Sequence, residues 1–413
     1  MHSPTSARRQ TRGACMTGLG LLGATAALPY VHFGAHGGGS DVALYDTYAT
    51  RVLDGELPYH DFFFEYPPLS LVALVLPKLT GLDYAISFRL LMWVLIAISL
   101  VAVLQTLSRL DAEPVRLYGA AVLIGGSPAL VGPILFERFD IWPAALLAVS
   151  LALLTAERWT AGSVLLALAI CTKLYPVVVA PVALVRAVSG AGSRVAGKAA
   201  TAGVAASALV TLPFAALGLG GLGFSYYVQF KRPLQLETLG ASILLGLDRL
   251  GLADTTVQSG LSKDLAGGTA AAVALVSTAL QLAAITAAAW WFWRGPRSAA
   301  SMLTAAAATV ASFVAFGKVL SPQYVIWLIP LAPLVARRVW PAAMALTVAA
   351  TALTNLYFPW HYSGIRQAND WVWVLLARNL ALVVLAFVLL VHLRREARQE
   401  RVQSANPPNV SRS

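Results

Sequence analysis

The chain has 413 residues, of which 58% are hydrophobic and only 12% charged, with a formal net charge of +11. Soluble domains carry about 25% charged residues, so the composition excludes a soluble multidomain enzyme. Membrane proteins concentrate Lys and Arg in cytoplasmic loops, which explains the positive charge without nucleic acid as a partner. We predict an all-α, polytopic membrane protein.

The first apolar run follows a short basic segment at residues 8–12. This arrangement resembles a signal peptide, but no small-residue cleavage site follows cleanly, so we predict an uncleaved first span. Residues 1–13 then form a cytoplasmic tail. Cys15 and Cys171 both lie in apolar stretches, which indicates no disulfide framework.

Apolar windows recur along a predicted transmembrane domain of residues 14–393. A helix needs about 20 residues to cross a bilayer, and on this basis we predict about 12 spans. Several windows are short or contain Pro and Gly, which helical bundles tolerate. The windows lie near 14–33, 84–108, 115–132, 140–156, 161–173, 176–188, 200–221, 269–293, 299–316, 323–336, 340–357 and 371–393.

The basic residues indicate the orientation of these spans. With the N-terminus inside, most of the 30 Lys and Arg residues fall in cytoplasmic segments. This positive-inside bias predicts that both termini are cytoplasmic. Residues 34–82 and 222–268 are then the two large outer loops. The arginine-rich segment 394–413 is predicted to be a disordered tail attracted to lipid headgroups.

Two short stretches need separate interpretation. Residues 161–188 are long for one span and short for two. A single crossing would put Arg186 and Arg194 outside, whereas two crossings, or a re-entrant pair turning at Lys173–Pro176, keep the positive-inside bias. Residues 67–79 are too short and too interrupted by Pro to span, and we expect them in the outer interface.

Six carboxylates gather within residues 40–69 of the first outer loop. Residues 41–54 have apolar and polar stripes at helical spacing, which predicts a short amphipathic helix resting on the bilayer surface. Asp41 begins this helix, where an acid is an ordinary N-cap, so capping and catalysis both stay open. Asp61 and Glu65 bracket three phenylalanines, and a partly dry setting can raise the pKa of a carboxylate into the range of a general base.

Cations lie at the outer ends of several spans. A lysine beside an apolar span with no nearby acid in sequence is costly, which favours a functional role for Lys173 and Lys318. Arg138 stands in the segment 137–140, where a local ion-paired turn is an equally good interpretation. Arg378, inside the last span, is interpreted as part of a structural ion pair.

Four stretches in this order resemble glycosyltransferase family 87. They are "DVALY" with "LDGELPYHDFFFEYPPL" at 41–69, "FERFDIWPAALLA" at 136–148, "CTKLYPVVVAPVAL" at 171–184, and "FGKVLSPQYVIWLIPLAPL" at 316–334. The resemblance covers residues from about 40 to 335. It implies a GT-C superfold and a polyprenyl-phosphate-dependent hexosyltransferase, with the α-mannosyltransferases as the best-known members.

The resemblance also implies roles for individual residues. Asp41, four residues before Tyr45, matches the general base of an inverting transfer, with Glu65 and Asp61 as possible second acids. The residues expected to bind the donor phosphate are Lys173, Lys318 and Arg138. The residues expected to line the sugar or lipid groove are Tyr45, Tyr66, Tyr175, Gln323 and Tyr324. Aromatic residues at these places also fit the interfacial belt of a membrane protein.

No Walker loop, dinucleotide fingerprint or Asp-X-Asp motif on a soluble domain is present in the sequence. We therefore expect no cofactor, while a divalent metal on Asp41, Asp46 and Glu65 stays open. The expected partners are a polyprenyl-phosphate sugar donor, a glycan or glycolipid acceptor and the lipid bilayer. The expected place of transfer is the outer face of the plasma membrane.

Two other functions compete with sugar transfer. A transporter or flippase for a lipid-linked solute should show two corresponding halves with broken helices near the midplane, and the sequence has no such internal match. A structural subunit of an envelope complex would not need unpaired cations at the ends of several spans.

Overall fold

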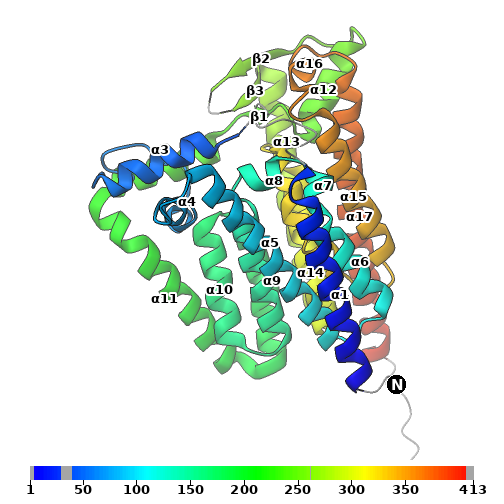
Figure 1. Ribbon diagram of the computed structural model, residues 1–413. Coiled ribbons are helices and arrows are strands. Elements are labelled where there is room, and N and C mark those ends of the chain that lie inside the picture. Colours follow the sequence, from blue (N-terminus) through cyan, green and yellow to red (C-terminus); the bar gives the residue numbers. More distant parts are fainter. Residues whose placement is uncertain (1–3, 29–39, 261, 406–413) are drawn as a thin grey trace, which may run out of the picture.

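The computed structural model describes residues 4–28, 40–260 and 262–405 (Figure 1). It is 77% helical with almost no strand. Long helices lie side by side as a bundle, and a layer of short helices and strands covers one end of it (Figure 1). The prediction of a helical fold is therefore confirmed, with a small sheet as an addition.

Five of the described helices are long and apolar enough to cross a membrane. They are Tyr84–Arg109, Tyr175–Lys231, Gly268–Arg294, Ala299–Phe316 and Trp371–Ser404. Shorter apolar helices lie at Pro114–Gly125, Ile141–Thr155, Trp159–Thr172 and Pro322–Leu334. These helices support the membrane character of the protein, whereas the count of about 12 spans stays a prediction.

The first half of the bundle forms mostly where the apolar windows predict it. Its helices are α1 (Pro4–Thr25), α3 (Val42–Leu53), α4 (Ser70–Lys78), α5 (Tyr84–Arg109), α6 (Pro114–Gly125), α7 (Ser127–Val131), α8 (Ile134–Glu137), α9 (Ile141–Thr155) and α10 (Trp159–Thr172). The predicted tail at 1–13 is already helical from Pro4, and Thr11 donates a hydrogen bond to Ser108 Oγ over 3.1 Å. The predicted end of the first span, 29–33, lies outside the described residues.

The doubtful segment after α10 reverses direction. After α10 the chain breaks at Lys173 and forms the 3-10 helix η1 (Tyr175–Val179), followed by α11 (Ala180–Lys231). Gly192, with φ 81°, interrupts α11. Before this interruption Arg186 contacts Glu157 beyond the far end of α9, and after it Gly221 lies against the backbone of Tyr59 near α3. These contacts agree with two passes along the bundle rather than one.

The helices and turns of the second half complete the bundle. They are α13 (Gly268–Arg294), α14 (Ala299–Phe316), the 3-10 helices η2 (Pro322–Leu328) and η3 (Ala332–Leu334), α15 (Trp340–Tyr357), α16 (Tyr362–Arg366) and α17 (Trp371–Ala405). The window 323–336 is not one continuous α-helix, because its prolines lack the N–H that an α-helix interior requires. Its side chains are nonetheless largely buried.

The C-terminal basic segment differs from the prediction. Helix α17 continues to Ala405, so residues 394–405 are helical rather than disordered. Ser301 donates a hydrogen bond to Glu396 Oε2 over 2.9 Å, which ties this extension to α14. The rest of the predicted tail, 406–413, lies outside the described residues.

The predicted outer loop 222–268 begins later and is more ordered than expected. Helix α11 runs to Lys231, and the following residues form α12 (Leu239–Arg249) and a three-stranded sheet in the order β1-β3-β2. The strands are β1 (Leu234–Gln235), β2 (Thr256–Ser259) and β3 (Lys263–Ala266), all pairing antiparallel. Strands this short carry little periodicity, which explains why the sequence pattern does not predict them.

The predicted amphipathic helix forms as α3, beside α4 in the layer at the end of the bundle (Figure 1). Its stripe of Val42, Tyr45 and Ala49 is buried, and the helix packs against α4 and α5. The apolar face therefore contacts the protein itself rather than the bilayer surface. This packing fixes the start of α3 above the bundle, which is where Asp41 lies.

Candidate active site

The start of α3 meets the segment between α8 and α9 through Asp41. The Asp41 carboxylate is paired with the guanidinium of Arg138, and the Tyr45 hydroxyl donates to Asp41 Oδ2 over 3.4 Å. Asp41 makes no side-chain capping bond, and the Val42 N–H instead donates to Ser40 Oγ over 3.2 Å. The capping interpretation of Asp41 is therefore wrong, and its carboxylate faces a cation.

The charges of the segment 137–140 pair with three different elements. Glu137 accepts from Arg89 of α5 at 3.0 Å, Arg138 pairs with Asp41 of the α3 layer, and Asp140 pairs with Lys173 at 2.7 Å. A local ion-paired turn is therefore the wrong interpretation of this segment. It is a junction that holds α5, α3 and the α10–η1 turn together.

Asp140 is the buried centre of the site and is 1% exposed. Its Oδ1 accepts from Lys173 Nζ and from Trp327 Nε1, both at 2.7 Å. Its Oδ2 is buried and has no hydrogen-bond partner within the described part of the chain. The lysine that lacks an acid nearby in sequence thus has one in space.

Aromatic rings enclose Lys173. Trp327 of η2 is stacked between Tyr175 and Tyr324, with ring centroids 3.9 Å away on each side. The Lys173 ammonium lies 5.4 Å from the centroid of Trp327 and 5.0 Å from that of Phe139. Cation–π attraction of this kind grows when water is excluded, so these rings hold the lysine in one place.

A second group of rings connects α3 to the same junction. Phe139 lies edge-on to Tyr45 and to Tyr66, with centroids 5.6 and 4.9 Å apart. Four of the five groove residues predicted from the sequence, Tyr45, Tyr66, Tyr175 and Tyr324, therefore line one aromatic region around the charged cluster. Gln323 is half-buried beside Tyr324.

The candidate site contains two neighbouring cations, Arg138 and Lys173. The side chains of Lys173 and Arg138 are only 15% and 13% exposed. Burial lowers the pKa of Arg138, against the charges of Asp140 and Glu237. An anion bound between Arg138 and Lys173 would relieve their repulsion. In this structure each cation already faces a carboxylate, Arg138 that of Asp41 and Lys173 that of Asp140, so an anionic ligand would share the cations with these two acids.

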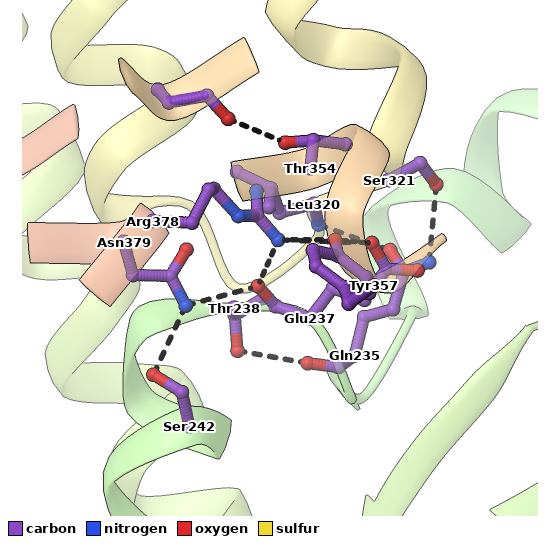
Figure 2. A network of polar contacts seen from close by, with 11 residues as sticks. Gln235, Glu237, Thr238, Ser242, Leu320, Ser321, Thr354, Tyr357, Arg378 and Asn379 are labelled. Carbon is purple, nitrogen blue, oxygen red and sulfur yellow. Dashed lines mark hydrogen bonds and ion pairs between the residues drawn. The ribbon is translucent and has the colours of Figure 1, made fainter. Parts of the chain in front are cut away.

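Lys318 lies at the edge of this end of the bundle, on a loop held by β1. Its ammonium donates to the Phe230 carbonyl over 2.8 Å, and burial lowers its pKa. Gln235 holds the loop with three hydrogen bonds. Its backbone N–H donates to the Lys318 carbonyl over 2.9 Å. Its Oε1 accepts from the Leu320 N–H over 3.0 Å, and its Nε2 donates to Ser321 Oγ over 3.1 Å (Figure 2). Within the described residues no contact joins Lys318 to Asp41 or Lys173.

A buried network lies behind Gln235 and joins the sheet layer to α15 and α17 (Figure 2). Glu237 is 2% exposed and Arg378 is 0% exposed, and their side chains lie 3.7 Å apart. The Tyr357 hydroxyl donates to Glu237 Oε2 over 2.8 Å and accepts from Arg378 Nη2 over 2.9 Å. The expected structural ion pair of Arg378 is confirmed, with Glu237 as its partner.

Asp61 and Asp46, two further acids of the segment 40–69, have partners outside this junction. Asp61 accepts from the Leu57 N–H over 2.7 Å and from His60, and this backbone bond leads the lowering of its pKa. Asp46 is paired with Lys78 at 2.5 Å. The role of Glu65 as a second acid stays a prediction, and its backbone carbonyl accepts from Gln229 Nε2 over 3.2 Å. Within the described residues no group of three or more His, Cys, Asp or Glu side chains could hold a metal ion.

Two residues of the cluster, Asp140 and Trp327, are not among those predicted from the sequence. Asp140 stands beside Arg138 and therefore resembles a local partner. Trp327 resembles an interfacial aromatic residue. The sequence feature that could have identified Asp140 is its place at the start of an apolar helix, because a carboxylate at the membrane needs a partner.

The model of glycosyltransferase family 87 matches residues 63–322, more than half of the chain. The match includes Glu65, Tyr66, Arg138, Lys173 and Lys318, and it begins after Asp41. No curated protein matches the sequence. The matched range contains the segments 136–148 and 171–184 on which the resemblance rests. The chain belongs to glycosyltransferase family 87.

Proposed function

We propose that this glycosyltransferase moves a hexose, in the first instance mannose, from a polyprenyl-phosphate sugar to a hydroxyl of an envelope glycan or glycolipid. The observation that supports this best is the junction of Asp41, Arg138, Asp140 and Lys173 at one end of an apolar bundle. A base beside two cations suits a phosphate leaving group. The apolar helices suit a donor that stays in the bilayer.

Asp41 acts as the general base in this proposal. Its carboxylate takes the proton of the acceptor hydroxyl, whose oxygen forms a bond to the anomeric carbon. The bond from that carbon to the phosphate oxygen breaks at the same time, and the polyprenyl phosphate leaves with the electron pair. One base is sufficient for such an inverting transfer, whereas a retaining hydrolase needs two carboxylates about 5 Å apart.

Arg138 and Lys173 stabilise the leaving phosphate. Negative charge develops on the phosphate as the bond breaks, and fixed cations in a water-poor site interact strongly with it. Without donor, Arg138 neutralises Asp41. A bound phosphate competes for the guanidinium, which returns basicity to Asp41 when the donor is in place. We assign Lys318 to the place where the donor headgroup enters the site, because Lys318 lies outside the central cluster.

The proposed active site faces the outer side of the plasma membrane, with both termini in the cytoplasm. The distribution of basic residues supports this orientation. The ends of α5 and α9 lie opposite α3 (Figure 1). Arg109 ends α5, Arg158 follows α9, and Arg186 pairs with the neighbouring Glu157, as expected if this end carries the positive charge of cytoplasmic loops.

The donor class can be tested directly. Purified protein in lipid nanodiscs is supplied with radiolabelled polyprenyl-phosphate mannose, polyprenyl-phosphate glucose or a nucleotide-linked mannose, together with a crude envelope glycolipid fraction. The proposal expects label in the acceptor fraction only with the polyprenyl donors, and most with mannose. Transfer from the nucleotide sugar alone would refute the proposed donor, and transfer from glucose alone would change the sugar.

A further inference from the structure

A groove lies on the side of the bundle at the end opposite the candidate active site. It has a volume of about 500 Å³ and lies between α1, α5 and α9. Its walls are formed by Leu19, Trp93, Val94, Ala97, Ile98 and neighbouring apolar residues of α5 and α9. Val94 and Ile98 are 46% and 43% exposed, so the groove is open to the medium around the helices.

Two arginines stand at one end of this apolar groove. Arg109 is the last residue of α5, and Arg158 follows the end of α9. Arg109 Nη1 makes one long hydrogen bond, 3.4 Å to the Ala152 carbonyl. The Arg158 guanidinium makes none to any described residue, and both side chains are exposed. Most of their N–H donors are therefore free for an external acceptor.

The carboxylates near the two arginines are used elsewhere or lie outside the groove. Glu157 pairs with Arg186 at 3.4 Å, and Glu113 pairs with Arg337 at 2.7 Å. Asp111 is exposed and does not line the groove. The end of the groove is thus strongly positive while its length is apolar.

We propose that this groove binds one anionic glycerophospholipid, with its phosphate on Arg109 and Arg158 and an acyl chain along α5. The guanidinium group matches a phosphate oxygen pair geometrically and electrostatically. Basic pockets between membrane helices on the cytoplasmic side are recognised sites for anionic headgroups. The acyl chain fills an apolar surface that faces the bilayer.

The charge of the groove distinguishes this occupant from others. A neutral lipid would leave the two guanidinium groups without an anion. A helix from a second copy of the chain would need acidic residues beside Arg109 and Arg158. The neighbouring segment of α1 adds further positive charge, from Arg8, Arg9 and Arg12. The α1 segment is close because Thr11 bonds to Ser108, one residue before Arg109. The sugar donor belongs at the other end of the bundle.

A lipid bound in this groove would contact three helices and stabilise their packing. The groove contacts α1 through Leu19, α5 through Trp93 and α9 through Val149. A chain bound between them adds apolar contacts that the protein alone leaves open. Ligand that binds the folded state alone stabilises it by mass action, so the melting temperature should rise with the anionic lipid.

Native mass spectrometry on the full-length protein tests the proposal. Delipidated protein is titrated with phosphatidylglycerol or with phosphatidylcholine of the same chain length. Wild type should bind one phosphatidylglycerol in preference to phosphatidylcholine. The double variant Arg109→Gln, Arg158→Gln should bind it roughly 30-fold more weakly, at about 1 kcal/mol for each basic residue. Its matched control is Arg194→Gln, Arg338→Gln, which removes the same charge outside the groove.

A second variant keeps the charge and fills the space. Ile98→Trp leaves both arginines in place and fills part of the groove. It should also weaken phosphatidylglycerol binding. The control double variant should bind phosphatidylglycerol as wild type does. Equal binding of the two lipids, or equal loss in the control, would overturn the proposal. A co-purified mass that matches a neutral lipid or a polyprenyl phosphate, not displaced by phosphatidylglycerol, would overturn it as well.

Discussion

The Arg138 guanidinium is paired with the Asp41 carboxylate, although the two residues come from different elements, the start of α3 and the segment before α9. Their side chains are 13% and 25% exposed, so the pair is partly shielded from water. The pair links the residue that the family resemblance marks as the base to a cation suited to the leaving phosphate. In the proposed reaction, the donor separates the two.

Two replacements of Arg138 should distinguish the effect of its positive charge on activity from the effect of its guanidinium geometry. Arg138→Gln should lower kcat by roughly 100- to 1,000-fold, the typical cost of removing a group that stabilises charge in a transition state. Arg138→Lys should recover part of this loss because it restores the charge without the two-pronged geometry. Initial rates with polyprenyl-phosphate mannose measure both. Equal activity of the Gln and Lys variants would argue against a role for the positive charge.

The buried Asp140–Lys173 pair should be much more costly to break than the half-buried Asp46–Lys78 pair at the edge of the structure. Removing one member of a buried pair leaves an uncompensated charge and costs about 3–5 kcal/mol of unfolding free energy. A surface pair contributes about 0.2–1 kcal/mol. Chemical unfolding of Asp140→Asn and of Asp46→Asn in detergent compares them.

The double variant Asp140→Asn, Lys173→Met gives the coupling between the buried partners. It should be less destabilised than the sum of its single variants, since it removes both charges. Additive single effects would mean that the pair does not interact in solution. Activity should be low in every variant that lacks Lys173.

Gln235 should act on donor binding through the loop that carries Lys318. Gln235→Ala removes the bonds to Leu320 and Ser321, which frees the loop and should raise KM for the donor several-fold with a smaller effect on kcat. The matched control is Gln258→Ala in β2, because Gln258 faces the same strand but is exposed. A KM equal to that of the control would contradict this role.

Burial of Glu237 should make stability depend on pH. Burial raises the pKa of Glu237 from 4.5 to about 7, while Arg378 and Tyr357 oppose the change. The folded state therefore binds the proton more tightly than the unfolded state. The resulting stability is complete below pH 4.5 and is lost as the pH rises through about 7. Its size is on the order of 3 kcal/mol.

The melting temperature in detergent, measured between pH 5 and pH 8, checks this dependence. Wild type should fall in stability across the range, and Glu237→Gln should fall much less because it has no proton to lose. A steeper fall in the variant than in wild type would contradict the assignment. Glu400→Gln, a half-buried acid on α17, is a control for the loss of one carboxylate.

The parts of the fold that follow from local pattern could be predicted from the sequence. Helical spacing predicts α3 almost to its ends, and apolar windows predict α5, α13 and α14. The turn at Lys173 follows from the positive-inside bias. The sheet beyond α11 could not be predicted, since its strands contain two to four residues and their pairing is set by contacts distant in sequence.

The sequence indicates which residues belong to the candidate site, but it does not indicate which of them form ion pairs with each other. Arg138 and Lys173 are recognisable by type and by position at span ends, and Asp41 is recognisable through the family resemblance. Their partners are not, because Arg138 has two acids beside it in sequence, and its ion pair with Asp41 joins it to a residue almost 100 positions away. Only the packing of α9, α10 and η2 brings Asp140 to both Lys173 and Trp327.

The most direct test of the proposed mechanism is the rate of mannose transfer by Asp41→Asn beside Asp46→Asn, both in nanodiscs with polyprenyl-phosphate mannose. Each variant removes one carboxylate from the same helix. Loss of the base should reduce kcat by roughly 100- to 10,000-fold in Asp41→Asn. Asp46→Asn should retain nearly all activity, since Asp46 only pairs with Lys78. Undiminished transfer by Asp41→Asn would contradict Asp41 as the base.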